Sequence, residues 1–506
     1  MTPRVLPKTE HLPHALYRAA QVRDFDRQAI EHFDMPGELL MERAGTAAFD
    51  FARSRWPQAQ RFVVLCGTGN NGGDGFVFAL AAQDAGMQVR VLQVGDPEAI
   101  SGDARSFADR WKAAGGDWAA FDQLPRDCDL IVDAMLGTGL QRQLRGEYYK
   151  AVEAANAHHA PKLALDLPTG LHADTGVALG IAVRAAATVS FIALKQGMFT
   201  ADGVDCCGEV HFEGLGVPAA VYGRHILAAR RISWSKEAAR LAPRARSAHK
   251  GHFGHVLVIG GDHGFGGAVR LAAEAAARCG AGLVSVATRE SHIAGLLAAR
   301  PELMVHGVDH THVLESLLDK ASVLVLGPGL GTGPWGRALF EMAIARGQPM
   351  VIDADALNLL AEVPAEQRPM SDNRVYTPHP GEAGRMLSVC TAEIHDDRFA
   401  AAQALQRRFG GCVVLKGAGT LVASPGQTPP ALCSEGNPGM ASGGMGDVLA
   451  GIIGSFLAQG WEPRASAEIG VALHAAAADR AAGGQGERGL LAGDLMPHIP
   501  GLVNNR

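Results

Sequence analysis

The sequence lacks any dense block of lysine or arginine, and its 506 residues carry a formal net charge of only −6. Nucleic-acid-binding proteins need concentrated positive charge, so nucleic acid is excluded as a main partner. No run of about 18 uncharged apolar residues is present, which excludes a membrane helix, because Arg184 and Asp447 interrupt the most apolar windows. The first residues contain prolines and charges instead of the apolar core of a secretory signal.

Cysteine is also scarce, with eight residues and no C-x-x-C motif. Cys206 and Cys207 are adjacent, and such pairs rarely form a structural disulfide. This usage favours a reducing, cytoplasmic compartment. The histidines in HKGHFGH, residues 249–255, do not have the spacing of a zinc site, and no fourth ligand is nearby.

What the sequence does contain is glycine, 63 residues of it, often directly after apolar runs. Short apolar runs alternate with helical patterns in both halves, which predicts α/β architecture with parallel sheets. The length predicts more than one domain. We expect a Rossmann-like three-layer αβα domain over residues 1–225 and a second α/β domain over 235–506. The arginine-rich segment 218–249 has few strand signals and is interpreted as the connection.

One glycine-rich stretch, GTGNNGGDG at residues 67–75, follows a predicted strand (61–66) and precedes a predicted helix (75–86). It contains G-x-G-x-x-G in the position of a dinucleotide-binding loop, although the same glycines could only form a tight turn. Asn70, Asn71 and Asp74 add side chains that a plain Rossmann turn does not need. The acidic residue expected about 20 positions later is also poorly placed.

Polar side chains follow other predicted strands of the first half. Asn71, Asp133 and Thr169 could supply oxygen ligands to a monovalent cation, but the commoner use of such residues is to cap helices and turns. Asp166 and Lys195 could exchange a proton in one pocket. The alternative for Lys195 is an exposed lysine at a strand end, which is more frequent.

The motifs MERAG, GTGNNGGDG, DAMLGTGL, LDLPTG and ALKQG, in this order over about residues 15–220, resemble the NAD(P)H-hydrate epimerase family (YjeF N-terminal domain). The resemblance implies that Asp166 and Lys195 are the acid–base pair. It implies a K⁺ site at Asn71, Asp133 and Thr169, where many members have serine at the last position. The implied contacts to the hydrated nucleotide are Asn70, Asn71, Gly72, Gly73, Asp74, Gly137, Thr138, Gly139, Leu140, Gln141, Arg142, Gln143 and Asp166.

The second half contains NPGMASGGMGDVLAGIIGSF, residues 437–456. A loop rich in glycine that runs into a helix can form an anion hole from its N–H groups and the helix dipole. Asp447 at the start of that helix is suited to take a proton from a hydroxyl group that attacks a phosphoryl group. The alternative is an ordinary aspartate helix cap.

Further polar motifs in this half follow predicted strands at 255–261, 282–288, 321–329, 349–357, 374–382 and 412–423. Asp353, Asp355 and Glu382 are candidates to bind Mg²⁺ through water or to line a polar pocket. His379 could contact a substrate, although a single histidine is more often structural. The VVLKGAGTLVA segment predicts a hairpin that could cover a nucleotide, or an ordinary glycine-rich hairpin.

The second half resembles the ribokinase-like superfamily and, within it, the ADP-dependent NAD(P)H-hydrate dehydratase family, over about residues 235–500. The motifs are HKGHFGHVLVIGG, GPGLG, DADALN, TPHPGE, KGAGT and NPGMASGGMGDVLAG. The resemblance implies a ribokinase-like fold and Mg²⁺ bound with ADP as co-substrate. The implied AMP or ADP contacts are Lys416, Gly417, Ala418, Gly419, Thr420 and Gly446. The implied hydrate contacts are Ala268, Gly329, His379 and Asp447.

Together the resemblances imply a bifunctional enzyme that repairs NADH and NADPH hydrated at C6 (NADHX and NADPHX). The first domain would interconvert the R and S epimers. The second would dehydrate the S form and convert ADP to AMP and phosphate. A small-alcohol kinase fused to a nucleotide-binding domain is the alternative, as is a first domain that only senses nucleotide. We also expect a homo-oligomer, with a homotetramer as one form.

Overall fold

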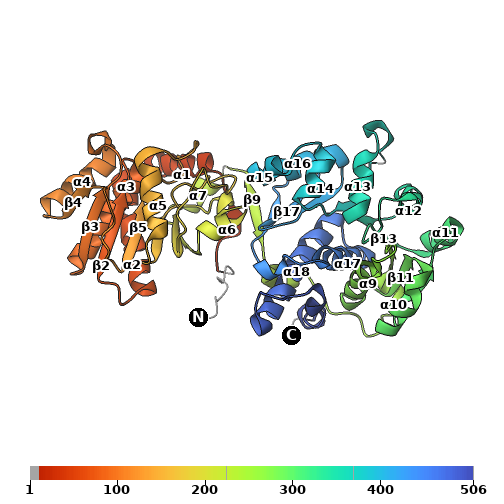
Figure 1. Ribbon diagram of the computed structural model, residues 1–506. Helices are drawn as coiled ribbons and strands as arrows, with labels where there is room; N and C mark the ends of the chain where they lie inside the picture. Colours follow the sequence, from red (N-terminus) through yellow and green to blue (C-terminus); the bar gives the residue numbers. More distant parts are fainter. Residues whose placement is uncertain (1–10, 224, 369, 505–506) are drawn as a thin grey trace. The chain divides into compact units, whose positions relative to one another are not determined.

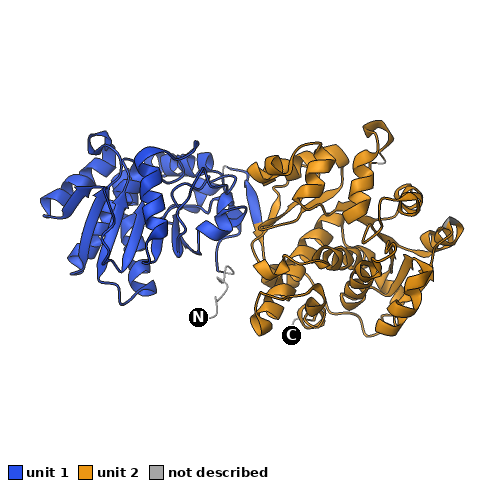
Figure 2. Ribbon diagram, in the orientation of Figure 1, with its two compact units in different colours: residues 1–230 blue, residues 231–506 orange. Residues whose placement is uncertain are grey.

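The computed structural model describes residues 11–223, 225–368 and 370–504. The chain forms two compact units, residues 1–230 (unit 1) and 231–506 (unit 2) (Figure 2). The predicted domain limits, 225 and 235, lie on either side of this division. Strands and helices alternate along both units, which confirms the predicted α/β class with two domains (Figure 1).

Unit 1 is built on a seven-stranded sheet in the order β4-β3-β2-β5-β6-β7-β8, with every neighbouring pair parallel. Parallel neighbours place all the carboxyl ends of the strands at one edge, where ligands bind in open α/β sheets. The strands are β2 (Arg61–Cys66), β3 (Gln88–Gln93), β4 (Asp117–Ala120), β5 (Leu130–Ala134), β6 (Lys162–Leu165), β7 (Ala187–Phe191) and β8 (Glu209–Glu213).

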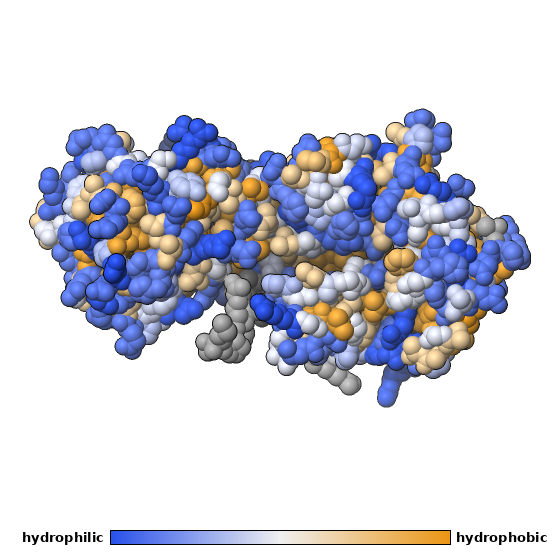
Figure 3. Space-filling model, in the orientation of Figure 1, coloured by the Kyte–Doolittle hydropathy of each residue, from blue (hydrophilic) through white to orange (hydrophobic). Residues whose placement is uncertain are grey.

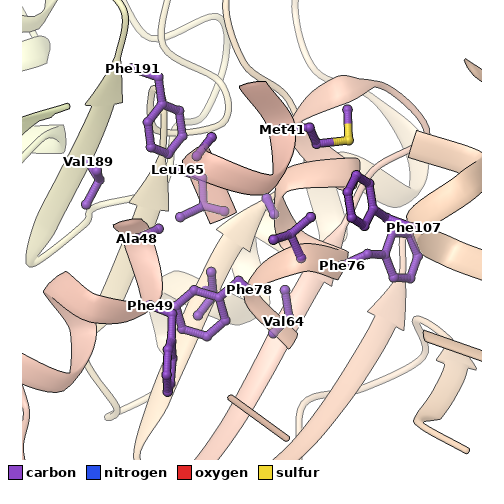
Figure 4. Packing of buried hydrophobic residues seen from close by; sticks show 14 of the residues in the cluster. Met41, Ala48, Phe49, Val64, Phe76, Phe78, Phe107, Leu165, Val189 and Phe191 are labelled. Carbon is purple, nitrogen blue, oxygen red and sulfur yellow. The ribbon is translucent and has the colours of Figure 1, made fainter. Parts of the chain in front are cut away.

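Alternate residues of these strands face two different helix layers, because successive side chains of a strand point to opposite faces. Val64 and Val132 pack in one cluster with four helices, and Leu65 and Ile131 pack in another with α5. In the first cluster Phe49 meets Phe78 edge to face, with ring centroids 5.6 Å apart (Figure 4). The predicted three-layer αβα arrangement is therefore confirmed. The helices are α1 (Ala19–His32), α2 (Gly37–Arg55), α3 (Asn70–Asp84) and α4 (Gly102–Ala113) on the first face, and α5 (Gly146–Ala157) on the second.

Helix α3 begins at Asn70, five residues before the predicted start at residue 75. Glycine and asparagine are weak helix formers, so the prediction began the helix too late. Tertiary packing explains the early start: a Cβ at Gly72 would lie 2.1 Å from the carbonyl oxygen of Gly67, so only glycine lets the first turn approach the end of β2 this closely. The NNGGD segment is thus the first turn of a helix.

Unit 2 contains a mixed sheet in the order β9-β18-β17-β16-β15-β14-β13-β10-β11-β12. The pairs from β16 through β12 are parallel, whereas β17 is antiparallel to both β16 and β18. The strands are β9 (Ala229–Ile232), β10 (His255–Ile259), β11 (Leu283–Thr288), β12 (Met304–Gly307), β13 (Val323–Leu326), β14 (Met350–Ile352), β15 (Arg374–Tyr376), β16 (Cys412–Leu415), β17 (Thr420–Ala423) and β18 (Ala431–Cys433).

The segment 218–249, interpreted as a connection with few strand signals, contributes β9 to this sheet. Its sequence is ARRI, and the two arginines hide the strand signal. Arg231 is nevertheless buried, and its Nη2 donates to the Ser434 hydroxyl at 3.0 Å. Partnered burial of the guanidinium is what allows this strand to form.

Three helices pack together against one face of the unit 2 sheet through residues such as Val269, Ile453 and Val471. They are α9 (Gly266–Arg278), α17 (Met445–Ala458) and α18 (Pro463–Gln485). None of the helices in the described parts of the chain combines the length and apolar character needed to cross a bilayer. On the face drawn in Figure 3, hydrophilic residues surround smaller hydrophobic areas in both units. The remaining elements are β1 (Ala15–Leu16), α6 (Gly203–Cys206), α7 (Ala219–Tyr222), α8 (Trp234–Ala238), α10 (Ile293–Ala299), α11 (Thr311–Lys320), α12 (Pro334–Ile344), α13 (Ala354–Glu362), α14 (Pro380–Leu387), α15 (Thr391–Asp396), α16 (Arg398–Phe409) and α19 (Ile499–Val503).

Candidate active sites

The polar residues predicted for unit 1 meet at the carboxyl ends of β5, β6 and β7. Asp133 lies in β5, Asp166 directly follows β6, and Lys195 lies four residues beyond β7. The Lys195 side chain is fully buried, and its Nζ donates to Asp166 Oδ1, to the Ser190 hydroxyl at 3.1 Å and to the Phe191 carbonyl at 3.2 Å. The expectation of an exposed strand-end lysine is therefore wrong.

The three N–H groups of the Lys195 ammonium match the three acceptors around it. Asp166 has a left-handed backbone (φ +63°), and its Oδ1 also accepts from the Phe191 N–H at 3.3 Å. The other oxygen, Oδ2, lies 3.3 Å from the position that a Cβ at Gly137 would take, and that position is 3.7 Å from Asn71 Cβ. Asp166, Gly137 and Asn71 are thus neighbours. Asp166 Oδ2 is the oxygen available for proton exchange.

The residues predicted to hold a cation are partly explained by turn hydrogen bonds. The fully buried Asp133 carboxylate accepts from the Thr169 hydroxyl at 2.7 Å and from the Thr169 N–H at 2.8 Å, and burial raises the pKa of Asp133 to about 6. Asn71 is different. It is buried, and in the described parts of the chain neither its side-chain Oδ1 nor its Nδ2 has a hydrogen-bond partner. Orphaned buried amides of this kind call for a bound ligand or ion.

In unit 2 the predicted residues meet at the carboxyl ends of β14, β15 and β16. Lys416 Nζ donates to Asp353 Oδ1 at 2.8 Å and lies 3.7 Å from Glu382 Oε2, while the Thr377 hydroxyl donates to the same Asp353 oxygen at 2.7 Å. Burial lowers the pKa of Lys416, but the charges of Asp353 and Glu382 outweigh it and raise the pKa overall. The ammonium is therefore a fixed positive charge.

Asp447 lies in the first turn of α17, beside Lys416. The N-cap of this helix is Gly444 (φ +90°), so the alternative of an aspartate cap is wrong. A Cβ at Gly446 would lie 3.2 Å from Lys416 Nζ, which places the ammonium over the N-terminus of the helix. Burial, then repulsion from Asp353, raises the pKa of Asp447 to about 7 although Lys416 opposes the shift. This pKa suits a general base at neutral pH.

His379 caps α14 through its side chain. Its Nδ1 accepts from the Gly381 N–H at 3.0 Å and from the Glu382 N–H at 3.3 Å. Burial and the charge of Lys416 lower the pKa of His379. The imidazole is thus neutral, and its Nε2 carries the hydrogen, which it can offer to Glu382 or to a ligand. His379 therefore has a structural role as the cap of α14, and its contact with the substrate stays a prediction.

The other predicted residues of unit 2 form two groups. In the first group, the Ala268 side chain lies 3.2 Å from the position that a Cβ at Gly329 would take. The loop of residues 327–331 is held near the end of β14, because the Gly331 N–H donates to Asp355 Oδ2 at 2.9 Å. Residues 416–420 form the predicted hairpin between β16 and β17, where the Thr420 hydroxyl donates to the Gly417 carbonyl at 2.9 Å.

Two residues near these groups were missed from the sequence. Arg398 is buried, and its Nη2 donates to the carbonyls of Leu415 at 3.3 Å and Lys416 at 3.2 Å. These hydrogen bonds fix the backbone at the start of the hairpin. Burial lowers the pKa of Arg398 to about 10. Phe265 is 60% exposed beside Gly329 and offers an apolar ring at the edge of the site. Neither residue lies in one of the glycine-rich or strand-end motifs named above for this unit.

No group of three or more histidine, cysteine, aspartate or glutamate side chains with metal-binding geometry is present in residues 11–223, 225–368 and 370–504. The cluster of Asp353, Glu382 and Lys416 is instead internally paired. Any Mg²⁺ that binds here would need oxygens from a ligand such as a nucleotide diphosphate, as is usual for this ion.

Comparisons with known proteins match both units. The family model described as "NAD(P)H-hydrate dehydratase" matches residues 256–501, and that described as "YjeF-related protein N-terminus" matches residues 37–197. The bifunctional NAD(P)H-hydrate repair enzyme of Coxiella burnetii is 45% identical over 490 residues, which cover 97% of this chain and 99% of the relative. That of Escherichia coli is 45% identical over 496 residues, with 97% and 95% coverage. A ribokinase-like protein of Enterococcus faecalis superposes with a TM-score of 0.51 at 29% identity, over 56% of this chain and 97% of its own.

Proposed function

The chain belongs to the family of bifunctional NAD(P)H-hydrate repair enzymes, and from this premise we propose how its two sites divide the work. Unit 1 interconverts the R and S epimers of hydrated NADH and NADPH at the buried pair of Asp166 and Lys195. Unit 2 dehydrates the S epimer and converts ADP to AMP and phosphate, with Asp447 as its base. The observation that carries this division is that each unit holds its own buried acid–base centre at the carboxyl ends of its strands.

In unit 2, Asp447 takes the proton of the C6 hydroxyl as that oxygen attacks the β-phosphorus of ADP, and AMP leaves. The N–H groups at the start of α17 and the Lys416 ammonium stabilise the charge on the transferring group. Phosphate then leaves C6, and loss of a C5 proton restores the nicotinamide ring. Mg²⁺ bound to ADP neutralises phosphate charge, and Asp353, Asp355 and Glu382 would hold it through water.

The remaining contacts in unit 2 follow from the same placement. We assign Lys416, the 417–420 turn that follows it and Gly446 to AMP or ADP, because the Lys416 ammonium lies beside Gly446 in the first turn of α17. Ala268, Gly329 and His379 are assigned to the hydrate. Asp447 is assigned to the reacting hydroxyl of the hydrate. A small-alcohol kinase would leave a stable phosphorylated product instead of phosphate and NADH.

In unit 1, the first turn of α3 and the 137–143 loop are proposed to hold the hydrated nucleotide over Asp166 Oδ2. A K⁺ ion would fit beside Asn71, whose side-chain amide has no partner in the described residues, with Asp133 and Thr169 as further oxygen donors. The ion supplies positive charge next to the substrate when bound. The buried Asp133 carboxylate, which has no cationic side chain bonded to it in the described residues, supports this assignment.

A mixture of both NADHX epimers, incubated with ADP or with ATP, tests the whole assignment. Recovery of all the NADH absorbance is expected with ADP, because both epimers reach the dehydratase. Recovery of one epimer only would contradict the epimerase assignment, and no recovery with either nucleotide would contradict the dehydratase assignment. The ADP and ATP arms also decide which nucleotide is used.

The K⁺ site can be tested without an activity assay. Replacing Asn71 with alanine is expected to abolish the rise in melting temperature that K⁺ gives the wild-type chain relative to the same concentration of Na⁺. A ligand at about ten times its Kd stabilises the folded state by about 1.4 kcal/mol, which thermal unfolding detects. Asn70→Ala, at the neighbouring exposed position, is the matched control and should retain the shift. A K⁺ shift that persists in Asn71→Ala would contradict the site.

All eight cysteines are free, and seven of them are buried. This supports a reducing compartment, and we place the protein in the cytoplasm. The expected homo-oligomer, with a homotetramer as one form, stays a prediction that light scattering of the purified chain would check.

A further inference from the structure

Helix α1 is held against the unit 1 site by the residues that precede it. The Tyr17 N–H donates to the Leu194 carbonyl at 2.9 Å, and the Gln196 N–H donates to the Tyr17 carbonyl at 3.0 Å, so residue 17 pairs with the segment that contains Lys195. The Ala19 N–H, at the first residue of α1, donates to Asp174 Oδ1 at 2.7 Å. The first turns of α1 are therefore fixed beside Lys195, although α1 precedes the residues that match the YjeF-related family model, 37–197.

Arg23 and Asp26 share one face of α1, because residues three apart on a helix are neighbours. Arg23 Nη1 donates to the Thr138 carbonyl at 3.2 Å, in the loop assigned to the substrate. Asp26 lies one helical turn after Arg23 on this face, within range of the charges of the buried pair: burial and then the charge of Asp166 raise the pKa of Asp26 to about 6, and Lys195 opposes the shift. This face of α1 thus brings a half-buried carboxyl group to the border of the site.

Epimerisation at C6 requires two proton-exchanging groups on the enzyme. The C6 carbon carries a hydroxyl group and is bonded to the ring nitrogen N1, so opening the ring needs one group to take the hydroxyl proton and another to give a proton to N1. Lys195 cannot readily be the second group, because its three N–H bonds are directed to Asp166, Ser190 and Phe191. Asp166 offers one oxygen, Oδ2. A second acid is therefore needed.

Two further carboxyl groups border the site, Asp26 and Asp74. Burial, followed by the charges of Asp166 and Asp26, raises the pKa of Asp74 well above its usual range. A group that both gives and takes a proton works best when its pKa lies near the operating pH, which favours Asp26. The buried amide of Asn71, which has no partner in the described residues, independently indicates that a ligand or ion binds at the first turn of α3, three residues before Asp74.

We propose that Asp26 is the second acid–base residue of the epimerase site and that Arg23 holds the 137–143 loop over the substrate. The proposal rests on the epimerase function assigned to unit 1. Asp166 takes the hydroxyl proton, the O–H electron pair becomes the second C–O bond of an aldehyde, and the C6–N1 pair moves to N1, which takes the proton of Asp26. Rotation about C5–C6 presents the other aldehyde face to N1. The reverse transfers close the ring with no net gain or loss of atoms.

The pH profile of epimerisation distinguishes this chemistry from a structural role. The charged or titratable groups around Asp26 are Asp166 and Lys195 beyond β6 and β7, Asp74 on α3, and Arg23 on α1 itself. Because Asp26 must start as the acid, kcat/KM for epimerisation should fall as the pH rises above about 6. In Asp26→Asn the decrease of kcat/KM at high pH should be absent.

The experiment uses the full chain and separated R and S hydrates, with interconversion followed by chromatography in the absence of nucleotide. Asp26→Asn should lower kcat by a factor on the order of 100, and Asp26→Glu should restore part of it. Asp24→Asn is the matched control, because Asp24 lies two residues away and pairs with Arg27 and His225. Dehydration of the S hydrate with ADP should be unchanged in all variants, which checks that the chain is folded.

Arg23 is tested in the same assay. Arg23→Ala should raise the KM for the hydrate and leave kcat nearly unchanged, whereas Arg27→Ala, at a position that is 64% exposed, should change neither. If Asp166→Asn is inactive but Asp26→Asn keeps the wild-type kcat and pH profile, the proposal for Asp26 is wrong. If Asp166→Asn were also fully active, the epimerase assignment itself would fail.

Discussion

Asp447→Asn is expected to lower the rate of dehydration by a factor on the order of 1,000, with epimerisation by the same chain unchanged. A positioned general base contributes about 10²- to 10⁴-fold to a reaction rate, and asparagine cannot accept the hydroxyl proton. Wild-type dehydration should rise with pH and level off above about 7, because the base must be ionised and the pKa of Asp447 is raised to about 7. The measurement is NADH recovery from the S hydrate with ADP across this pH range.

The same substitution should stabilise unit 2 at alkaline pH. The folded-state pKa of Asp447 lies above its ordinary value of 3.8, so the folded chain binds this proton more tightly than the unfolded chain does. Stability from this group is present below about pH 4 and is lost as the pH rises through 7, with a total effect of about 4 kcal/mol. Asp447→Asn should therefore melt at a higher temperature than the wild type at pH 8, with the difference vanishing toward pH 4.

Glu462→Gln is the matched control, since Glu462 is an exposed carboxylate just before another helix of unit 2. It should change neither dehydration nor the pH dependence of melting. An Asp447→Asn chain that dehydrates at the wild-type rate would reduce Asp447 to a structural residue of the α17 turn. A variant that is inactive and also less stable at pH 8 would mean that the loss of activity reflects misfolding.

The sequence predicted where the sites lie because parallel strands end at a common edge. Asp133, Asp166 and Lys195 each follow or end a short apolar run, and that pattern alone placed them together. The same reasoning placed Asp353 and Lys416 in unit 2. These positions can be recognised from the local sequence alone, because a run of β-branched and aliphatic residues is followed by glycine or a polar residue.

Other features depend on partners distant in sequence and were therefore misjudged. The burial of Lys195 requires Asp166, which is 29 residues away. The helical start of NNGGD requires close contact between Gly72 and the end of β2, which helix propensity does not register. Asp26 was missed because an aspartate on an amphipathic helix looks the same in sequence whether it faces solvent or a neighbouring carboxylate. The pairing of Tyr17 with Lys195, which fixes the start of α1 beside the site, is needed to distinguish these two environments.

The second large effect concerns the buried pair of unit 1. Asp166→Asn is expected to lower epimerisation, measured above the uncatalysed rate, by a factor on the order of 1,000, and Lys195→Met by on the order of 100. Asp166 provides the reacting oxygen, whereas Lys195 orients it through the hydrogen bond to Oδ1. The measurement is interconversion of separated epimers without nucleotide, and Asp24→Asn is again the control.

The single substitutions of Asp166 and Lys195 are expected to differ in how much they destabilise unit 1. Removing one partner of a buried ion pair typically costs about 3–5 kcal/mol, because the other charge is left without compensation. The Lys195 side chain is fully buried and that of Asp166 is 17% exposed. Asp166→Asn, which leaves the more deeply buried charge alone, should therefore destabilise unit 1 more than Lys195→Met does. The double variant should be less destabilised than the sum of the two, as calorimetry of the full chain would measure.

If Asp166→Asn is less stable than Lys195→Met while both variants still epimerise the hydrate at the wild-type rate, the ion pair is confirmed and the catalytic assignment is contradicted. Unit 1 would then be a domain that senses nucleotide, and the repair of R hydrate would depend on spontaneous epimerisation. Dehydration of a pure R hydrate decides between these cases, since unit 2 receives S hydrate only as fast as it is formed. In the catalytic case Asp166→Asn slows NADH recovery from the R hydrate and leaves recovery from the S hydrate unchanged. In the sensing case it slows neither.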